Sequence, residues 1–214
     1  MRMIDLSTWP RQKHFEMFSQ FDYPHFNICS KVDITATLHS AREIKQSINT
    51  VLIYCLARAA NELPEFRLRI RNGQVIEHEQ VQPSASVLSK DNLFSFCTMP
   101  YDPDYQVFSP KAEEMIQFRL GHPTLDDEPG QDDLLFMSCI PWIDFTSISH
   151  PIHMHPADSI PRITWGKFTT GNGRTCMPVS VQVHHGLMDG YHVGQYYQIL
   201  QELLDSPANW MGRA

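Results

Sequence analysis

Apolar and polar positions along the chain repeat with two different periods, so the pattern predicts both helices and strands. Between Ser47 and Leu63 the apolar residues recur at i, i+3, i+4, i+7, i+8 and i+11, the spacing of a helix with one buried stripe. A second helical stripe runs from Val193 to Leu204. Two further helices are expected, over Pro10–Gln20, where a proline suits the first turn, and over Lys111–Leu120.

Alternating and β-branched positions predict the strands. Val179, Val181 and Val183 alternate clearly, and Phe26–Leu38 is interpreted as another strand. The dipeptide Asn72-Gly73 is a strong hairpin signal between two short strands. The remaining expected segments are the flanking strands Phe66–Ile70 and Gln74–Ile76, a strand-turn-strand over Val87–Met99 with its turn at Asp91-Asn92, strand regions in Leu134–Phe145 and Arg162–Thr169, and an exposed loop over Gly121–Asp133.

Helices and strands are mixed without a regular β-α-β rhythm. This order favours an α/β two-layer sandwich, with a mixed, largely antiparallel sheet and helices packed on it. A chain of 214 residues suits one domain, so residues 1–214 are predicted to form a single domain.

Composition narrows the classes of function. The 42% of hydrophobic residues argues against disorder, and a net charge of −7 is a poor match for nucleic acid or an anionic membrane. The five cysteines are scattered and form no C-x-x-C pair, which is typical of a reducing compartment. The start of the chain has no signal-peptide pattern, and the longest apolar run, Val51–Ala57, is too short to span a membrane. We therefore expect a cytoplasmic protein.

The most informative segment follows the alternating strand, in the sequence Val-His-His-Gly-Leu-Met-Asp-Gly over residues 183–190. A histidine at a strand end can act as a general base, because its neutral form is available near pH 7. A histidine pair can also be a satisfied core or surface group, and Asp189-Gly190 can be only a turn. From these residues alone, both interpretations stay open.

The pattern His184-His185-x-x-x-Asp189-Gly190 resembles the HHxxxDG signature of the coenzyme A-dependent acyltransferases. The run over residues 178–193 is similar to the chloramphenicol acetyltransferase family in particular. Three more segments resemble that family in the same order, namely residues 9–16, 30–34 and 141–145. The resemblance covers nearly the whole chain and implies an acetyl-CoA-dependent O-acetyltransferase that acetylates chloramphenicol.

The resemblance also implies catalytic roles. His185 would remove the proton from the acceptor hydroxyl, so that this oxygen attacks the acetyl thioester directly. Ser138 would donate a hydrogen bond to the oxyanion, and Thr164 would hold a water molecule near the intermediate. Asp189 would pair with Arg11 and tie the first helix to the catalytic turn.

Binding residues carried over from the family are of two kinds. The acceptor pocket would involve Phe18, Phe26, Cys29 and Phe94, and acetyl-CoA would contact Trp142, Lys167 and Phe168. Phe18 stands where known members have a tyrosine, which removes one possible polar contact to the acceptor.

In this family the active sites lie between the subunits of a homotrimer. The resemblance therefore implies that the partners of this chain are further copies of itself. A related acetyltransferase acting on another small alcohol is the alternative, and a non-catalytic binding protein on the same fold is a third possibility. The core of the 2-oxo acid dehydrogenase complexes is the nearest rival by size. His150, His153 and His155 lack a matching set of cysteine or carboxylate ligands, so no metal is expected.

Overall fold

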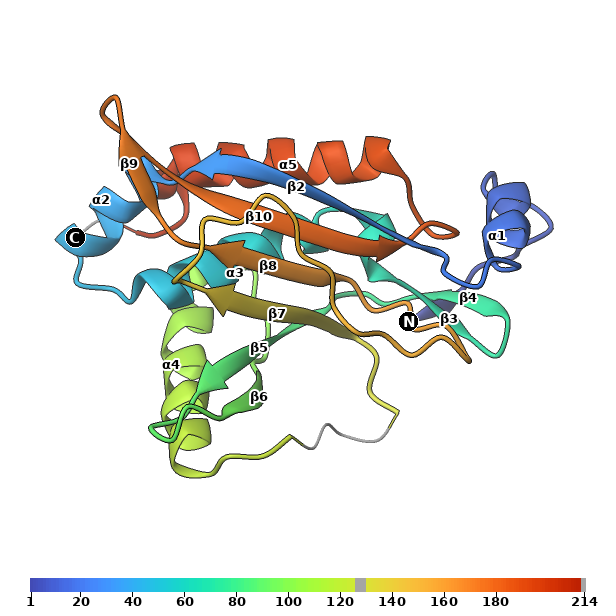
Figure 1. Ribbon diagram of the computed structural model, residues 1–214, viewed down its shortest axis with the longest axis horizontal. Coiled ribbons are helices and arrows are strands. Elements are labelled where there is room, and N and C mark those ends of the chain that lie inside the picture. Colours follow the sequence, from blue (N-terminus) through green and yellow to red (C-terminus); the bar gives the residue numbers. More distant parts are fainter. Residues whose placement is uncertain (126–129, 213–214) are drawn as a thin grey trace.

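A mixed sheet of seven strands occupies the middle of the computed structural model, which describes residues 1–125 and 130–212 (Figure 1). Six strands follow one another in the order β2-β10-β8-β7-β5-β6, and β9 pairs with β10. The pairs β5–β7 and β7–β8 are parallel and the other pairs antiparallel, which confirms the predicted mixed, largely antiparallel sheet. The strands are β2 (His25–Asp33), β5 (Gln82–Leu88), β6 (Phe94–Thr98), β7 (Leu134–Ile140), β8 (Arg162–Gly166), β9 (Thr169–Gly171) and β10 (Arg174–His184).

Four helices form the second layer and cover one face of this sheet (Figure 1). Central α3 is more deeply buried than its single predicted stripe implied, because ten of its fourteen residues are inaccessible to solvent. It packs against α5 and against the apolar side of the sheet, where Val179, Val181 and Val183 lie. The helices are α2 (Thr35–Glu43), α3 (Ile48–Asn61), α4 (Tyr105–Gly121) and α5 (Gly190–Asp205), and a short α1 (Gln12–Phe18) lies apart at one end of the molecule.

A second, three-stranded sheet in the order β1-β4-β3 contains the predicted hairpin. Asn72 and Gly73 both have positive φ, 50° and 75°, as a two-residue hairpin turn of this kind requires. The residues before the hairpin strand form a 3-10 helix rather than the start of a strand. The elements are β1 (Arg2–Met3), η1 (Pro64–Arg67), β3 (Leu68–Arg71) and β4 (Gln74–Glu77), and a last 3-10 helix, η2 (Pro207–Asn209), follows α5.

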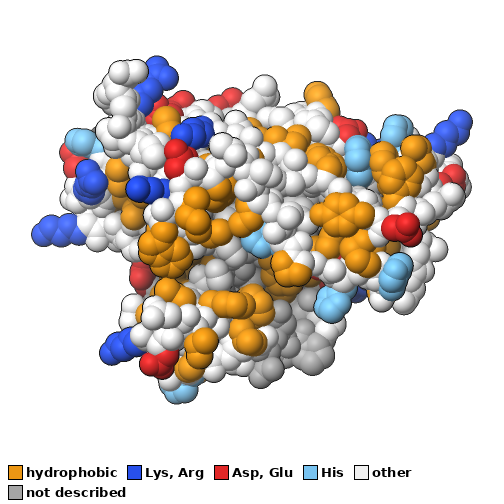
Figure 2. Space-filling model, in the orientation of Figure 1, with side chains coloured by type: hydrophobic (Ala, Val, Ile, Leu, Met, Phe, Trp, Pro, Cys, Tyr) orange, Lys and Arg blue, Asp and Glu red, His pale blue; other side chains and the backbone are white. Residues whose placement is uncertain are grey.

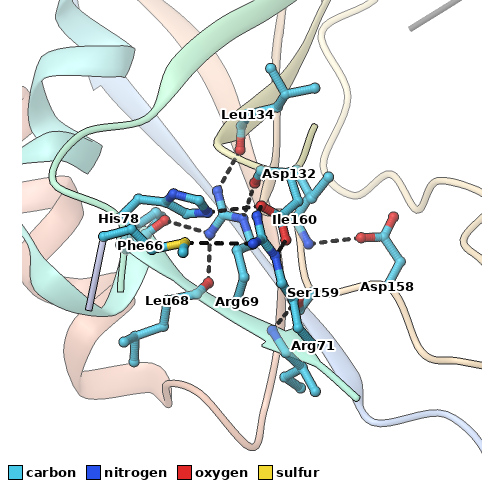
Figure 3. Close-up of polar contacts among 12 residues, drawn as sticks. Phe66, Leu68, Arg69, Arg71, His78, Asp132, Leu134, Asp158, Ser159 and Ile160 are labelled. Atoms are coloured by element: carbon cyan, nitrogen blue, oxygen red, sulfur yellow. Dashed lines mark hydrogen bonds and ion pairs between the residues drawn. The ribbon is translucent and has the colours of Figure 1, made fainter. Parts of the chain in front are cut away.

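Two arginines of β3 join the small sheet to the segment that leads into β7 (Figure 3). Arg69 is fully buried and donates hydrogen bonds to four backbone carbonyl oxygens, those of Phe66, Leu68, Asp132 and Leu134. Arg71 holds both carboxylate oxygens of Asp132, and His78 contacts one of them. Burial opposes ionisation of Asp132, but these hydrogen bonds outweigh it and keep the pKa of Asp132 well below its usual range.

Several predicted boundaries are wrong. The strand predicted over Phe26–Leu38 ends at Asp33, where the Asp33 carboxylate accepts the Thr35 N–H and α2 begins. The helix predicted from Lys111 begins at Tyr105, capped by Asp104, and includes Pro110. The strand region expected to reach Phe145 ends at Ile140. The strand predicted to begin at Val87 begins earlier, at Gln82, as β5.

The exposed loop predicted over Gly121–Asp133 lies partly outside the described residues, at positions 126–129. At its far end, residues 131–133 are half-buried rather than exposed, because Asp132 is held by Arg71 and His78. Within the described parts of the chain, no helix is long and apolar enough to cross a membrane.

Candidate active site

The turn between β10 and α5 presents the histidine pair. Asp189 caps α5, since its carboxylate accepts the Tyr191 N–H at 3.0 Å. The Asp189 N–H in turn donates to Nδ1 of His192 at 3.2 Å, which completes a capping box. A Cβ at Gly186 would lie 3.0–3.3 Å from the rings of His184 and Phe15, so the tight turn favours glycine at this position.

His185 is fixed by contacts on several sides. Its ring stacks on the Phe18 ring, with the two ring centroids 3.9 Å apart. It also contacts the Phe26 ring, with a centroid-to-centroid distance of 4.6 Å. Its Nδ1 lies 3.1 Å from the Met188 carbonyl oxygen, which can only accept, so Nδ1 carries the proton of this hydrogen bond. In the neutral ring Nε2 is then unprotonated, as a general base requires.

Arg11 joins α1 to this turn. Its Nη1 donates to Asp189 at 2.7 Å and its Nη2 donates to the His185 carbonyl oxygen at 3.1 Å. Burial acts to raise the pKa of Asp189, but the hydrogen bonds from Arg11 and the Tyr191 N–H outweigh it, and the pKa is lowered. The structure therefore brings Arg11 and Asp189 together in the expected ion pair, and it adds a direct contact to the backbone of His185.

The first histidine of the pair has a different environment. His184 is only 2% exposed, and its Nδ1 accepts the Gly186 N–H at 3.1 Å. Burial, reinforced by the neighbouring histidines His25 and His185, lowers the pKa of His184 to about 4. His184 is therefore a neutral, structural member of the turn near pH 7.

A second group of candidate residues lines a groove of about 560 Å³ on the open face of the sheet. Ser138 of β7 and Thr164 of β8 are direct register partners there, because the two strands are parallel neighbours. Figure 2 shows hydrophobic side chains gathered around the hollow on this face, and Phe94 and Trp142 are among the lining residues. Both aromatic side chains are more than half exposed, as expected for a binding surface rather than a core.

Polar residues that the sequence did not assign to the reaction share this groove. The Ser86 hydroxyl donates to Ser138 Oγ at 3.4 Å, and His150 Nε2 lies 2.7 Å from Thr164 Oγ1. Arg162 also lines the groove, paired with Asp158 at 2.5 Å. The sequence indicates His150 only as a metal-ligand candidate, because the proline-rich segment around it gives no periodic signal of its position.

The predicted site residues therefore form two groups in one chain. His185, Phe18 and Phe26 lie beside the β10–α5 turn and are not among the residues that line the groove. Cys29 is half-buried on β2, also away from the groove lining. Lys167 is exposed and Phe168 packs at the edge of the core, so of the three predicted acetyl-CoA contacts only Trp142 lines the groove. Among the described residues, no group of histidine, cysteine or carboxylate side chains could hold a metal ion.

Comparison with known proteins agrees with this architecture. A family model described as chloramphenicol acetyltransferase matches residues 1–201. The chain is 32% identical to a chloramphenicol acetyltransferase of Bacillus pumilus, with 98% of this chain and 96% of the relative covered. It is 30% identical to chloramphenicol acetyltransferase 2 of Escherichia coli, over 95% and 96% of the two chains.

Solved structures show the same relationship. A chloramphenicol acetyltransferase structure superposes with a TM-score of 0.86 at 28% identity, covering 95% of this chain and all of that one. A dihydrolipoamide acetyltransferase of Azotobacter vinelandii has a TM-score of 0.69 at 18% identity and covers 94% and 88% of the two chains, which shows a shared fold. The chain thus belongs to the chloramphenicol acetyltransferase family of acyltransferases.

Proposed function

We propose that this chain transfers the acetyl group of acetyl-CoA directly to a hydroxyl of chloramphenicol, with His185 as the general base. The observation that carries the proposal is the Nδ1 contact to the Met188 carbonyl, which leaves Nε2 free to accept a proton. The stacked Phe18 ring and the Arg11 bond to the His185 carbonyl hold the imidazole in one orientation. Such positioning is what a proton-transfer residue needs.

The reaction would proceed without an acyl-enzyme. His185 Nε2 removes the proton of the acceptor hydroxyl as its oxygen bonds to the thioester carbonyl carbon. The Ser138 hydroxyl donates to the resulting oxyanion, a contact of the kind that typically contributes about 100- to 1000-fold in rate. When the C–S bond breaks, the imidazolium returns its proton to the CoA thiolate, and the products are the acetyl ester and free CoA.

The groove itself suits the acetyl-CoA co-substrate. Its walls are mainly apolar and aromatic, and Trp142 stands exposed at its edge. Ser138 and Thr164 offer hydroxyl groups within it. Lys167 follows β8 on the surface, where its cation could face a phosphate group.

We further propose a homotrimer in which His185 of one subunit faces the groove of the next. The support is the separation of the two groups, since the groove that holds Ser138 and Thr164 is lined by neither His185 nor its stacking partner Phe18. Such a homotrimer would act in the cytoplasm on a small-molecule acceptor. The alternative acceptor, another small alcohol, gains support from Phe18, whose ring offers no hydroxyl at the base.

The test is release of free thiol from acetyl-CoA with a panel of hydroxyl acceptors that includes chloramphenicol. We expect His185→Ala to lower turnover by at least about 100-fold, the usual contribution of a positioned base. His39→Ala, which removes an exposed histidine on α2, is the matched control and should leave turnover unchanged. Full turnover by His185→Ala would refute the assignment of the base, and thiol release only with other alcohols would favour the alternative acceptor.

Shared sites can be tested by mixing inactive chains. In a trimer with sites between subunits, each mixed trimer of His185→Ala and Ser138→Ala chains regains one intact site. Equal, random mixing should therefore restore about a quarter of wild-type activity, because three-quarters of the trimers are mixed and each has one good site of three. No recovery on mixing, with each variant still folded, would show that the site lies within one chain.

A further inference from the structure

His150 places a second imidazole at the site, in the same groove as Ser138. Its Nε2 lies 2.7 Å from Thr164 Oγ1, a short hydrogen bond between two side chains that line the cavity. Neither the sequence motif nor the family resemblance gives this histidine a part in the reaction. Its neighbours His153 and His155 are exposed, so His150 differs from the other histidines of its segment.

The backbone of His150 is fixed by a buried amide. Gln182 of β10 is 1% exposed, and its side-chain oxygen accepts the His150 N–H at 2.8 Å. The Gln182 amide nitrogen donates to the Tyr23 hydroxyl at 3.2 Å and lies 3.5 Å from the His150 carbonyl oxygen. The segment between β7 and β8, which crosses the open face of the sheet (Figure 1), is thus pinned to β10 at His150.

The charge state of the ring suits a neutral hydrogen-bonding role. Burial, reinforced by the positive charge of Arg162, lowers the pKa of His150. Arg162 is itself paired with Asp158 and lies over the Phe136 ring at 5.3 Å. Near pH 7 the imidazole is therefore uncharged, with one nitrogen bonded to the Thr164 hydroxyl.

We propose that His150 is a positioning residue that fixes the direction of the Thr164 hydroxyl beside Ser138. A threonine hydroxyl rotates between staggered positions unless a partner selects one, and the His150 side chain is the partner that contacts Thr164 Oγ1. Thr164 is the register partner of Ser138, so its hydroxyl borders the region where the oxyanion would form. This inference rests on the proposed function, because it concerns the hydroxyl that would order water at the reacting acyl group.

The test is a double-mutant cycle on turnover with His150→Leu, Thr164→Val and the combined variant. If His150 acts through Thr164, His150→Leu lowers kcat by up to about tenfold, as expected for one lost hydrogen bond, and leaves the KM for acetyl-CoA unchanged. In the Thr164→Val background the same change should have no further effect. His150→Gln, whose amide can reach the hydroxyl, should recover most of the kcat, and His153→Leu in the same segment is the control.

The other possible outcomes would contradict either the positioning role of His150 or the proposed acetyl transfer. Wild-type kcat in His150→Leu, or an equal loss of kcat with and without the Thr164 hydroxyl, would overturn the positioning role while acetyl transfer stands. No thiol release by the wild-type protein with any acceptor would overturn the proposed function and this inference together. A large fall in unfolding free energy for both His150→Leu and His150→Gln, without rescue of kcat, would assign His150 to folding instead.

Discussion

Acidification should destabilise this protein through His184, the buried histidine beside the proposed base. The ring has an ordinary pKa of 6.5 when unfolded and a pKa of about 4 in the folded chain, because burial disfavours its charged form. The unfolded chain therefore binds more protons between these values, so stability falls as the pH decreases from about 6.5 to 4. Above that window the contribution is constant, and below it the loss is complete.

The size of the effect follows from the two pKa values. Linkage between them gives a loss of about 2 kcal/mol on going from pH 7 to pH 5, and about 3 kcal/mol below pH 4. His184→Asn should remove this term, since its short amide can accept the Gly186 N–H without a titrating group. The same change at an exposed histidine, His39→Asn on α2, should leave the pH dependence as it is.

The assay is urea unfolding at pH 7 and pH 5, at one protein concentration for all chains. Titrating groups that do not interact with His184 contribute equally to the two curves, so they cancel when the variant is compared with the wild type. We expect the decrease in unfolding free energy between the two pH values to be about 2 kcal/mol smaller for His184→Asn. Equal decreases in the two proteins would show that His184 is not buried in its neutral form, and the description of the turn would then be wrong.

Three other substitutions test contacts that support the site or the fold. Arg11→Ala should lower both the melting temperature and turnover, since the Asp189 carboxylate and the His185 carbonyl each lose a donor; unchanged melting would contradict the structural role. Gly166→Ala should destabilise the protein by about 1–3 kcal/mol in urea unfolding, because its Cβ would lie 2.6 Å from the Ile143 carbonyl oxygen. Arg69→Met should cost at least about 2 kcal/mol by the same measurement, because buried carbonyls lose their donors, and a neutral result would refute the importance of that cluster.

Local patterns were sufficient for much of the fold. The alternation at Val179, Val181 and Val183 reflects one apolar face of β10, and Asn72-Gly73 fixes its hairpin because both residues must adopt positive φ. The boundary between β2 and α2 was missed, because β-branched residues continue past Asp33 while the side chain of Asp33 turns the chain into a helix. The periodicity of apolar residues reflects which side chains are buried. The position at which a strand ends, however, depends on single hydrogen bonds such as the one made by Asp33.

The candidate site, too, could be predicted from the sequence only in part. The turn with His184 and His185 is continuous in sequence, so its motif could be recognised. The partner of Asp189 lies 178 residues away, and only the resemblance to a family suggested Arg11. His150 could not be assigned at all, because its position depends on the amide of Gln182, 32 residues further along the chain, and a proline-rich segment carries no periodic signal.

The two groups of reactive side chains are each completed by contacts within one chain, and this bears on how a shared site would work. His185 is held by Phe18, Met188 and Arg11, whereas Ser138 and Thr164 are aligned by the register of two parallel strands. Neither group needs the other for its own geometry. A chain that lacks His185 should therefore still have an intact groove. A chain that lacks the Ser138 hydroxyl should still hold the His185 imidazole in its correct orientation. That independence is the physical reason why two inactive chains should restore activity when they assemble together.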